Sequence, residues 1–130
     1  MVTGGGSGLG RIFCIALAEF GADIICCDIN QAAAKETACF VEQFGKHTLV
    51  MQVDVTRHSD IKNMLQKAMP SIGRIDILVN NAGISTKPAQ IHDISINNWN
   101  KVIAVNLTGT FLCMKNVLPI MMNQNEGCVI

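Results

Sequence analysis

Five glycines crowd the first ten residues of this 130-residue chain, at positions that suit the binding of an anion. They are Gly4, Gly5, Gly6, Gly8 and Gly10. The interior of a helix or strand does not tolerate so many glycines, so the segment is predicted to be a loop. Apolar residues recur at helical spacing directly after it, which puts the loop at the amino terminus of a helix. The free N–H groups and positive dipole end of such a helix bind phosphate, and glycine lets the backbone come close to it.

An acidic residue further along the chain adds a second polar contact. Asp28 ends a short apolar run, about twenty residues beyond the glycine loop, where a carboxylate can accept hydrogen bonds from both hydroxyls of a nucleotide ribose. The same carboxylate repels a 2′-phosphate, and its neighbours Cys27, Ile29 and Asn30 carry no positive charge. The loop alone indicates only an anionic ligand, because its spacing matches neither G-x-G-x-x-G nor a Walker loop. With Asp28, the residues favour NAD over NADP; an ordinary tight turn and a solvated carboxylate are the alternatives.

The elements that must position these residues alternate between strand and helix. Helices are predicted over residues 9–20, 31–44, 59–69 and 95–123, and Pro119 is expected to kink or break the last of them. Strands are predicted over residues 1–3, 24–28, 48–55 and 75–79, with a fifth beginning at 127–130.

This alternation predicts an α/β fold, a doubly wound parallel sheet (Rossmann fold) with helices on both faces. Strands 1 to 5 would be present and the fold incomplete. Residues 1–130 are expected to form a single dinucleotide-binding domain. Ligands of such sheets bind beyond the carboxyl ends of the strands, where the glycine loop and Asp28 are expected to lie.

Composition narrows the possible partners. Hydrophobic residues make up 49% of the chain and charged residues 15%, so a folded core is expected. Ten basic and ten acidic side chains cancel without any basic cluster, which argues against nucleic-acid and membrane-surface binding. The apolar stretch 111–122 is interrupted by Lys115 and Asn116 and is too short to cross a bilayer.

The cysteines and histidines suggest no metal site. The six cysteines contain no C-x-x-C pair and lie in apolar segments, so all are expected to be reduced core residues. The three histidines are scattered, and no metal ligand set is predicted. Reduced cysteines without a secretory leader predict a cytoplasmic protein.

Four motifs in order along the chain resemble those of the short-chain dehydrogenase/reductase family. Segment 3–10 resembles its T-G-x-x-x-G-x-G loop, Asp54-Val55 its D-V pair, segment 80–83 its N-N-A-G motif, and Asn106 falls where the family keeps a catalytic asparagine. The resemblance covers essentially the whole chain. Together with Asp28, it gives these expected cofactor-binding residues: Gly4, Gly6, Ser7, Gly8, Leu9, Gly10, Asp28, Ile29, Asp54, Val55, Asn81, Ala82 and Gly83.

The resemblance also implies roles for individual residues. Asp54 would bond the adenine amino group with Val55 beside the ring, and the N-N-A-G segment would steady the sheet and line the cofactor cleft. The backbone carbonyl of Asn106 would hold a water in a proton relay. Each residue also has a structural alternative: a capping carboxylate for Asp54, a turn residue for Asn80 or Asn81, and a solvated helix side chain for Asn106.

The residues that perform the chemistry in this family are missing. They are a serine and a Y-x-x-x-K pair beyond strand five, whereas this chain has no tyrosine and no serine after Ser95. The sequence is therefore expected to be an amino-terminal part, clipped also just before its first strand. Negligible turnover is expected from it alone.

The leading functional hypothesis is an NAD-dependent oxidoreductase that interconverts an alcohol and a ketone of a small-molecule substrate. An NADP-dependent 3-oxoacyl or carbonyl reductase, and a non-catalytic nucleotide-binding module, are the alternatives. The resemblance implies a homo-oligomeric parent, a dimer or tetramer, that pairs through the long helix. Core packing is expected to use half or more of the apolar residues on that helix: Phe111, Leu112, Met114, Leu118, Met121 and Met122.

Overall fold

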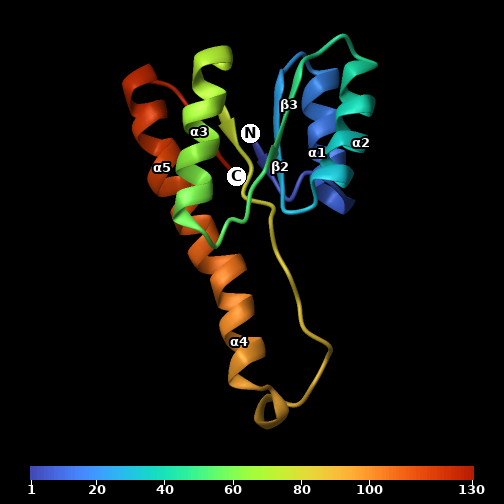
Figure 1. The fold of residues 1–130 in the computed structure, drawn as a ribbon, viewed down its shortest axis with the longest axis vertical. Helices are drawn as coiled ribbons and strands as arrows, with labels where there is room; N and C mark the ends of the chain where they lie inside the picture. Colours follow the sequence, from blue (N-terminus) through green and yellow to red (C-terminus); the bar gives the residue numbers. More distant parts are fainter.

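The computed structural model describes all residues from Met1 to Ile130 and places a parallel sheet between two layers of helices (Figure 1). Strands β1 (Val2–Thr3), β2 (Ile24–Asp28) and β3 (Thr48–Gln52) form one ladder, and β4 (Ile77–Leu78) pairs with β5 (Cys128–Val129). A parallel bridge between Val2 and Val79 joins the two ladders. The strand order is therefore β3-β2-β1-β4-β5, and the predicted doubly wound parallel arrangement is confirmed.

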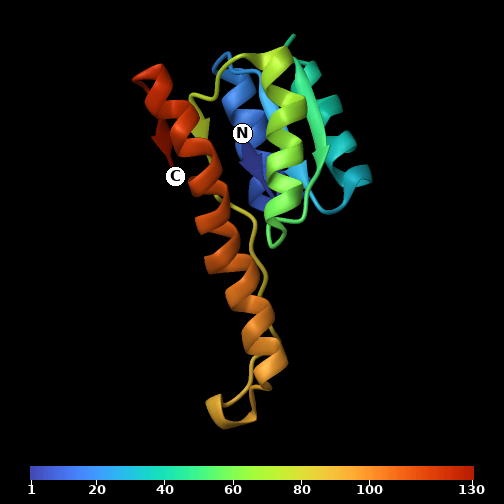
Figure 2. The same cartoon turned by 60° about the vertical axis from the view of Figure 1, so that its left-hand side comes forward.

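Helices cover both faces of the sheet. Helices α1 (Gly8–Glu19) and α2 (Gln31–Glu42) lie on one face, and α3 (His58–Ile72) and α5 (Thr110–Gln124) on the other (Figures 1 and 2). Helix α5 continues a longer helix that begins with α4 (Ile96–Ile103) and passes through the π-helical segment η2 (Ala104–Gly109). Both views show α4 extending away from the sheet beside the chain that follows β4, which includes the short helix η1 (Ile91–Asp93).

Strand β2 lies at the centre of the core. Ile24 and Cys26 pack with residues of α1 and α2, while Ile25 and Cys27 pack with residues of α3 and α5. All four side chains are at most 3% exposed. Burial on both faces confirms the interpretation of this apolar run as an interior parallel strand.

The bounds of several elements differ from the predicted ones. Strand β3 ends at Gln52 because the chain turns at Asp54, whose carboxylate accepts the amide of Thr56. Helix α2 ends at Glu42, in a turn that leads to Gly45 at φ +69°. Strand β4 is confined to Ile77–Leu78, and helix α3 extends to Ile72 before Gly73 adopts φ +76°.

The long helix was predicted to kink or break at Pro119, and the prediction of a break is wrong. Helix α5 runs through this residue. Proline has no N–H to donate, so the carbonyl of Lys115 loses its helical hydrogen bond. Both Lys115 and Pro119 are exposed, so water can satisfy that carbonyl. The irregular turn lies instead at Ala104–Gly109. The predicted start of the long helix is confirmed, since the Ser95 hydroxyl accepts a hydrogen bond from the amide of Asn98 at 3.2 Å.

The long helix is partly buried. The whole helix, Ile96–Gln124, has 29 residues and is long and apolar enough, by length and composition, to cross a membrane. The stretch 111–122 alone is too short to do so. The core helix of a soluble protein has the same properties, and Cys113 and Val117 are buried in the core beside α3. Of the six apolar residues named above, Leu112, Met114 and Met121 pack on the core and the other three are exposed. This confirms the prediction that half or more of them serve core packing.

The prediction that all six cysteines belong to the core needs correction. All are free thiols, and four are buried, but Cys39 and Cys128 are exposed. Cys39 lies on the outer side of α2, whose buried residues include Ala38 and Val41, and Cys128 lies in the strand at the edge of the sheet.

Candidate functional site

A cavity of about 440 Å³ lies where β1 to β4 end. Of the residues predicted to bind the cofactor, only Gly6, Gly8 and Gly10 do not line it. Three apolar residues that were not predicted also line it: Val53, Ile84 and Val105. Sequence reasoning missed them because isolated apolar residues outside the predicted site carry no distinctive chemistry. The structure therefore gathers the glycine loop, Asp28, the D-V pair and the N-N-A-G segment around one space, whereas Asn106 does not line it.

The glycine loop joins β1 to α1 through a very close backbone contact. A methyl group at Gly10 would collide with the carbonyl oxygen of Gly4 and lie 2.5 Å from Asn81 Nδ2. Gly4 itself has φ +62°, a conformation that side chains disfavour. These two positions require glycine, and they allow the first turn of α1 to sit directly on the end of β1.

The first turn of α1 offers unpaired hydrogen-bond donors at this cavity. Ser7 is the N-cap residue, and the first amide of the turn with a backbone partner is that of Arg11, which donates to the Ser7 carbonyl at 3.2 Å. The amides of Gly8, Leu9 and Gly10 precede any possible partner within the helix. Since Ser7 and Leu9 line the cavity, the start of this helix lies at its wall, and the free amides there favour an anion.

Asp28 lines the same cavity and is held firmly in place. Its Oδ2 accepts the amide of Gly6 and its Oδ1 accepts the amide of Asn30, both at 2.8 Å. A carboxylate oxygen can accept more than one hydrogen bond, so both oxygens can still bind hydroxyl groups of a ligand. The neighbouring Ile29 is fixed as well, because its carbonyl accepts a hydrogen bond from Gln52 Nε2 at 3.2 Å.

Asp54 lies at the end of β3 with its carboxylate turned back on its own chain. Oδ1 accepts hydrogen bonds from the Thr56 amide at 2.9 Å and the Thr56 hydroxyl at 2.7 Å. Oδ2 lies 3.6 Å from Arg57 Nε, and the amide of Asp54 donates to Asp60 at 3.3 Å. Asp54 therefore caps its own turn, as the structural alternative to adenine binding predicted. It also lines the cavity, as does Val55.

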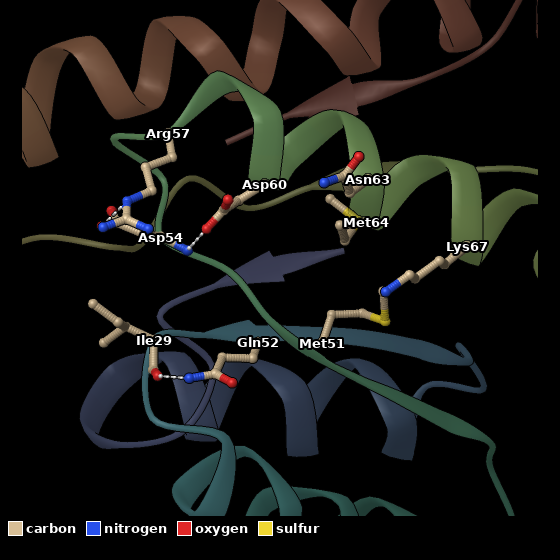
Figure 3. Close-up of a pocket in the computed structure, with 9 residues that line it drawn as sticks. All are labelled: Ile29, Met51, Gln52, Asp54, Arg57, Asp60, Asn63, Met64 and Lys67. Atoms are coloured by element: carbon tan, nitrogen blue, oxygen red, sulfur yellow. Dashed lines mark hydrogen bonds and ion pairs between the residues drawn. The ribbon is translucent and has the colours of Figure 1, made fainter.

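A second cavity, of about 430 Å³, adjoins the first between β3 and α3 (Figure 3). The two cavities share Ile29 and Asp54. Figure 3 shows Arg57 beside Asp54 at one end and Lys67 beside Met51 at the other. Asp54 therefore separates a cavity whose only ionisable side chains are acidic from a neighbouring one lined by both acidic and basic side chains.

A buried threonine fastens the N-N-A-G segment to β1. The Thr3 hydroxyl accepts the amides of Asn81 at 3.1 Å and Ala82 at 3.0 Å, and it donates to the Val79 carbonyl at 3.3 Å. Asn81 Nδ2 donates to the carbonyls of Thr3 and Gly4 at 2.9 and 3.1 Å. Thr3 opens the glycine motif but was not among the expected site residues, and its role is to hold two walls of the cavity together.

Asn106 lies in η2 and pairs with the backbone of Ile84. Its Oδ1 accepts the Ile84 amide at 2.9 Å and its Nδ2 donates to the Ile84 carbonyl at 3.0 Å. Its own carbonyl accepts the Thr110 hydroxyl at 2.9 Å. π-Helical turns are frequent at functional sites. The side chain of Asn106 is thus not simply solvated, since it holds the chain that leaves the N-N-A-G segment.

Gly109 is a further residue that sequence reasoning missed. A methyl group there would lie 2.8 Å from Val55 Cγ2, so glycine lets the long helix approach the end of β3. A glycine inside a helical pattern was the available signal, since it usually marks a close contact or a bend.

Comparisons with known proteins agree with this geometry. The sequence matches the short chain dehydrogenase family over residues 1–130. It is 37% identical over 128 residues to a short chain dehydrogenase/reductase of Aspergillus oryzae, an alignment that covers 98% of this chain and 49% of that protein. The chain thus spans about half the length of the curated relatives it matches.

Solved structures give the same picture. Carveol dehydrogenase from Mycobacterium avium, in complex with NAD, superposes with a TM-score of 0.93 at 30% identity, over 98% of this chain and 51% of its own. A 3-ketoacyl-ACP reductase from Sinorhizobium meliloti superposes with a TM-score of 0.93 at 31% identity, over 98% and 50%. With the family match over its entire length, these likenesses show that the chain belongs to the short-chain dehydrogenase family of oxidoreductases.

Proposed function

We propose that this chain is the NAD-binding part of an oxidoreductase that interconverts an alcohol and a ketone of a small-molecule substrate. When bound, NAD supplies the hydride acceptor. The amides of residues 8–10 would bind the diphosphate, the Asp28 carboxylate the adenosine ribose, and Asp54 and Val55 the adenine. Asn81, Ala82 and Gly83 would line the remaining part of the cleft.

One observation carries the preference for NAD. The cavity is lined by two carboxylates, Asp28 and Asp54, and by no lysine or arginine. A 2′-phosphate beside Asp28 would meet a like charge at close range, which costs binding energy in a partly enclosed site. Calorimetric titration with NAD and NADP tests the proposal, and we expect NAD to bind at least about tenfold more tightly, or about 1.4 kcal/mol. Tighter binding of NADP would contradict it.

Arg57 supports a second candidate, an NADP-linked carbonyl or oxoacyl reductase. Its side chain is 70% exposed and lies 3.6 Å from Asp54, at the adenosine end of the proposed site. A guanidinium there could swing towards a 2′-phosphate. The same titration decides between the two, and loss of NADP affinity in Arg57→Gln would identify the residue responsible.

The chemistry itself is proposed to need residues that this chain lacks. The chain has no tyrosine, the general base of the family, so we expect no turnover by the 130 residues even where NAD binds. The carbonyl of Asn106 is proposed to serve the proton relay of the full-length protein. The exposed residues Phe111, Leu118 and Met122 are proposed to pair in its homo-oligomer. Dinucleotide binding without turnover by the full-length protein would favour a non-catalytic module instead.

A further inference from the structure

The backbone of Gly5 and Gly6 is fully hydrogen-bonded within the protein. The Gly5 amide donates to the Cys27 carbonyl at 3.0 Å, and the Gly5 carbonyl accepts the Thr37 hydroxyl at 2.9 Å. The Gly6 amide donates to Asp28 at 2.8 Å, and the Gly6 carbonyl accepts Arg11 Nη2 at 2.7 Å. The Gly5–Gly6 peptide is therefore held from two sides, at its carbonyl by Thr37 and at its amide by Asp28, whereas the next peptide is held at its carbonyl by Arg11.

The two side chains that hold the carbonyls also bind each other. Arg11 Nε donates to the Thr37 hydroxyl at 3.1 Å. Thr37 is fully buried, and it and Thr3 are the two buried polar residues of the chain. Arg11 is 27% exposed, its guanidinium lies 5.6 Å from the centre of the Phe40 ring, and it forms an outer ion pair with Glu36 at 3.0 Å. Burial of a hydroxyl is costly unless it has partners, and the Thr37 hydroxyl has two acceptors, the Gly5 carbonyl at 2.9 Å and the Ala33 carbonyl at 3.2 Å, of which the Gly5 carbonyl is the nearer.

Neither Arg11 nor Thr37 lines the cavity, so neither is placed to bind a ligand directly. What they fix is the direction of two carbonyl oxygens in a loop that meets an anion. A carbonyl oxygen carries partial negative charge and would repel a diphosphate if the peptide rotated towards it.

We propose that Arg11 and Thr37 are positioning residues for the dinucleotide diphosphate. By binding the carbonyls of Gly6 and Gly5 on the α2 side of the loop, they keep these oxygens away from the anion and leave the amides of residues 8–10 to face it. This inference rests on the proposed function, since it concerns the same site.

The test compares ligands with and without phosphates in the full-length protein and its variants. Arg11→Met keeps the aliphatic stem over Phe40 and removes the guanidinium, and Thr37→Val keeps the shape and removes the hydroxyl. We expect the Kd for NAD to rise roughly tenfold or more in each variant, while the Kd for adenosine, measured by displacement of NAD, changes less than about twofold. Two matched controls should bind NAD as the unchanged protein does: Glu36→Gln, which removes only the outer ion pair, and Thr37→Ser, which keeps the hydroxyl.

Three outcomes would overturn the inference. If Arg11→Met and Thr37→Val bind NAD normally while their unfolding temperatures fall, the network serves stability alone. If adenosine and NAD affinities fall together, the variants disturb the whole site rather than the diphosphate part. If the unchanged protein binds no dinucleotide, the proposed function fails together with the inference, and this result is recognised without any variant.

Discussion

The carboxylate of Asp28 accepts the backbone amide of Gly6 at 2.8 Å, although 22 positions separate the two residues in sequence. The bond joins the end of β2 to the glycine loop after β1. The Gly6 amide thus orients the Asp28 carboxylate, which is proposed to bind the ribose. Gly6 itself belongs to the loop that leads to the proposed diphosphate site. The two halves of the proposed adenosine-diphosphate site are therefore one hydrogen-bonded unit.

Asp28→Asn tests this unit. The amide side chain has one acceptor oxygen, so either Gly6 or Asn30 loses its partner, and the negative charge that disfavours a 2′-phosphate disappears. We expect NAD binding to weaken by about 1.5–3 kcal/mol, roughly ten- to a hundredfold in Kd, and NADP to weaken less. Calorimetry with both dinucleotides measures the change. An unchanged ratio of the two Kd values would show that Asp28 does not set the preference.

Gly10→Ala tests the close contact between α1 and β1. The new methyl group would collide with the Gly4 carbonyl, so the helix must move away from the strand. We expect a loss of at least about 2 kcal/mol in the free energy of unfolding, measured in urea, and loss of NAD binding. Gly45→Ala is the matched control, because Gly45 has φ +69° and no atom within 4 Å of the new methyl group. It should cost only about 1 kcal/mol and leave NAD binding intact.

Thr3→Val tests the buried hydroxyl that joins β1 to the N-N-A-G segment. Valine has the same shape but leaves the partly buried amides of Asn81 and Ala82 without their acceptor. We expect the free energy of unfolding to fall by about 3 kcal/mol. Thr3→Ser keeps the hydroxyl and loses one methyl group, so it should cost about 1 kcal/mol. Equal losses in the two variants would show that packing, not hydrogen bonding, is what matters at this position.

The features that could be predicted from sequence are those set by local chemistry. Gly10 and Asp28 belong to patterns whose function depends on residue type at short spacing, and β2 is apolar because both of its faces are buried. The parallel arrangement with helices on both faces follows from the alternation of strands and helices, whereas the order of the strands was not predicted. The fold class and most of the residues that line the cavity were therefore accessible without coordinates.

The features that could not be predicted depend on contacts between distant residues. Thr37 is an ordinary threonine in a helical sequence, and only the packing of α1 against α2 brings it to the Gly5 carbonyl. The π-helical turn at Ala104–Gly109 has only a single glycine as a local signal. Pro119 has a strong signal but lies at an exposed position, where water can satisfy the freed carbonyl. Tertiary context decides both cases.

Asn106→Ala tests the connection between η2 and the chain after the N-N-A-G segment. Both hydrogen bonds to Ile84 would be lost, so we expect the Ile84 amide to exchange with solvent roughly tenfold faster in hydrogen-exchange measurements. Asn106→Asp keeps an acceptor for the Ile84 amide and loses the donor to its carbonyl, so its exchange rate should lie nearer that of the unchanged protein. Equal protection of Ile84 in all three proteins would mean that other contacts hold this segment.

The buried thiol of Cys113 predicts a loss of stability at alkaline pH. Burial raises the pKa of this thiol from its ordinary value of 9.0 to about 11, so the unfolded chain releases the proton at lower pH than the folded one. The resulting stability is complete below pH 9 and is lost as the pH rises towards 11, by up to about 1.4 kcal/mol for each pH unit. Urea unfolding between pH 8 and about 11 should therefore give a shallower pH dependence for Cys113→Ala than for the unchanged protein. Val117→Ala removes a buried side chain that does not titrate, so it should lower stability equally at every pH. Parallel pH profiles for Cys113→Ala and the unchanged protein would show that this thiol ionises alike in the folded and unfolded chains.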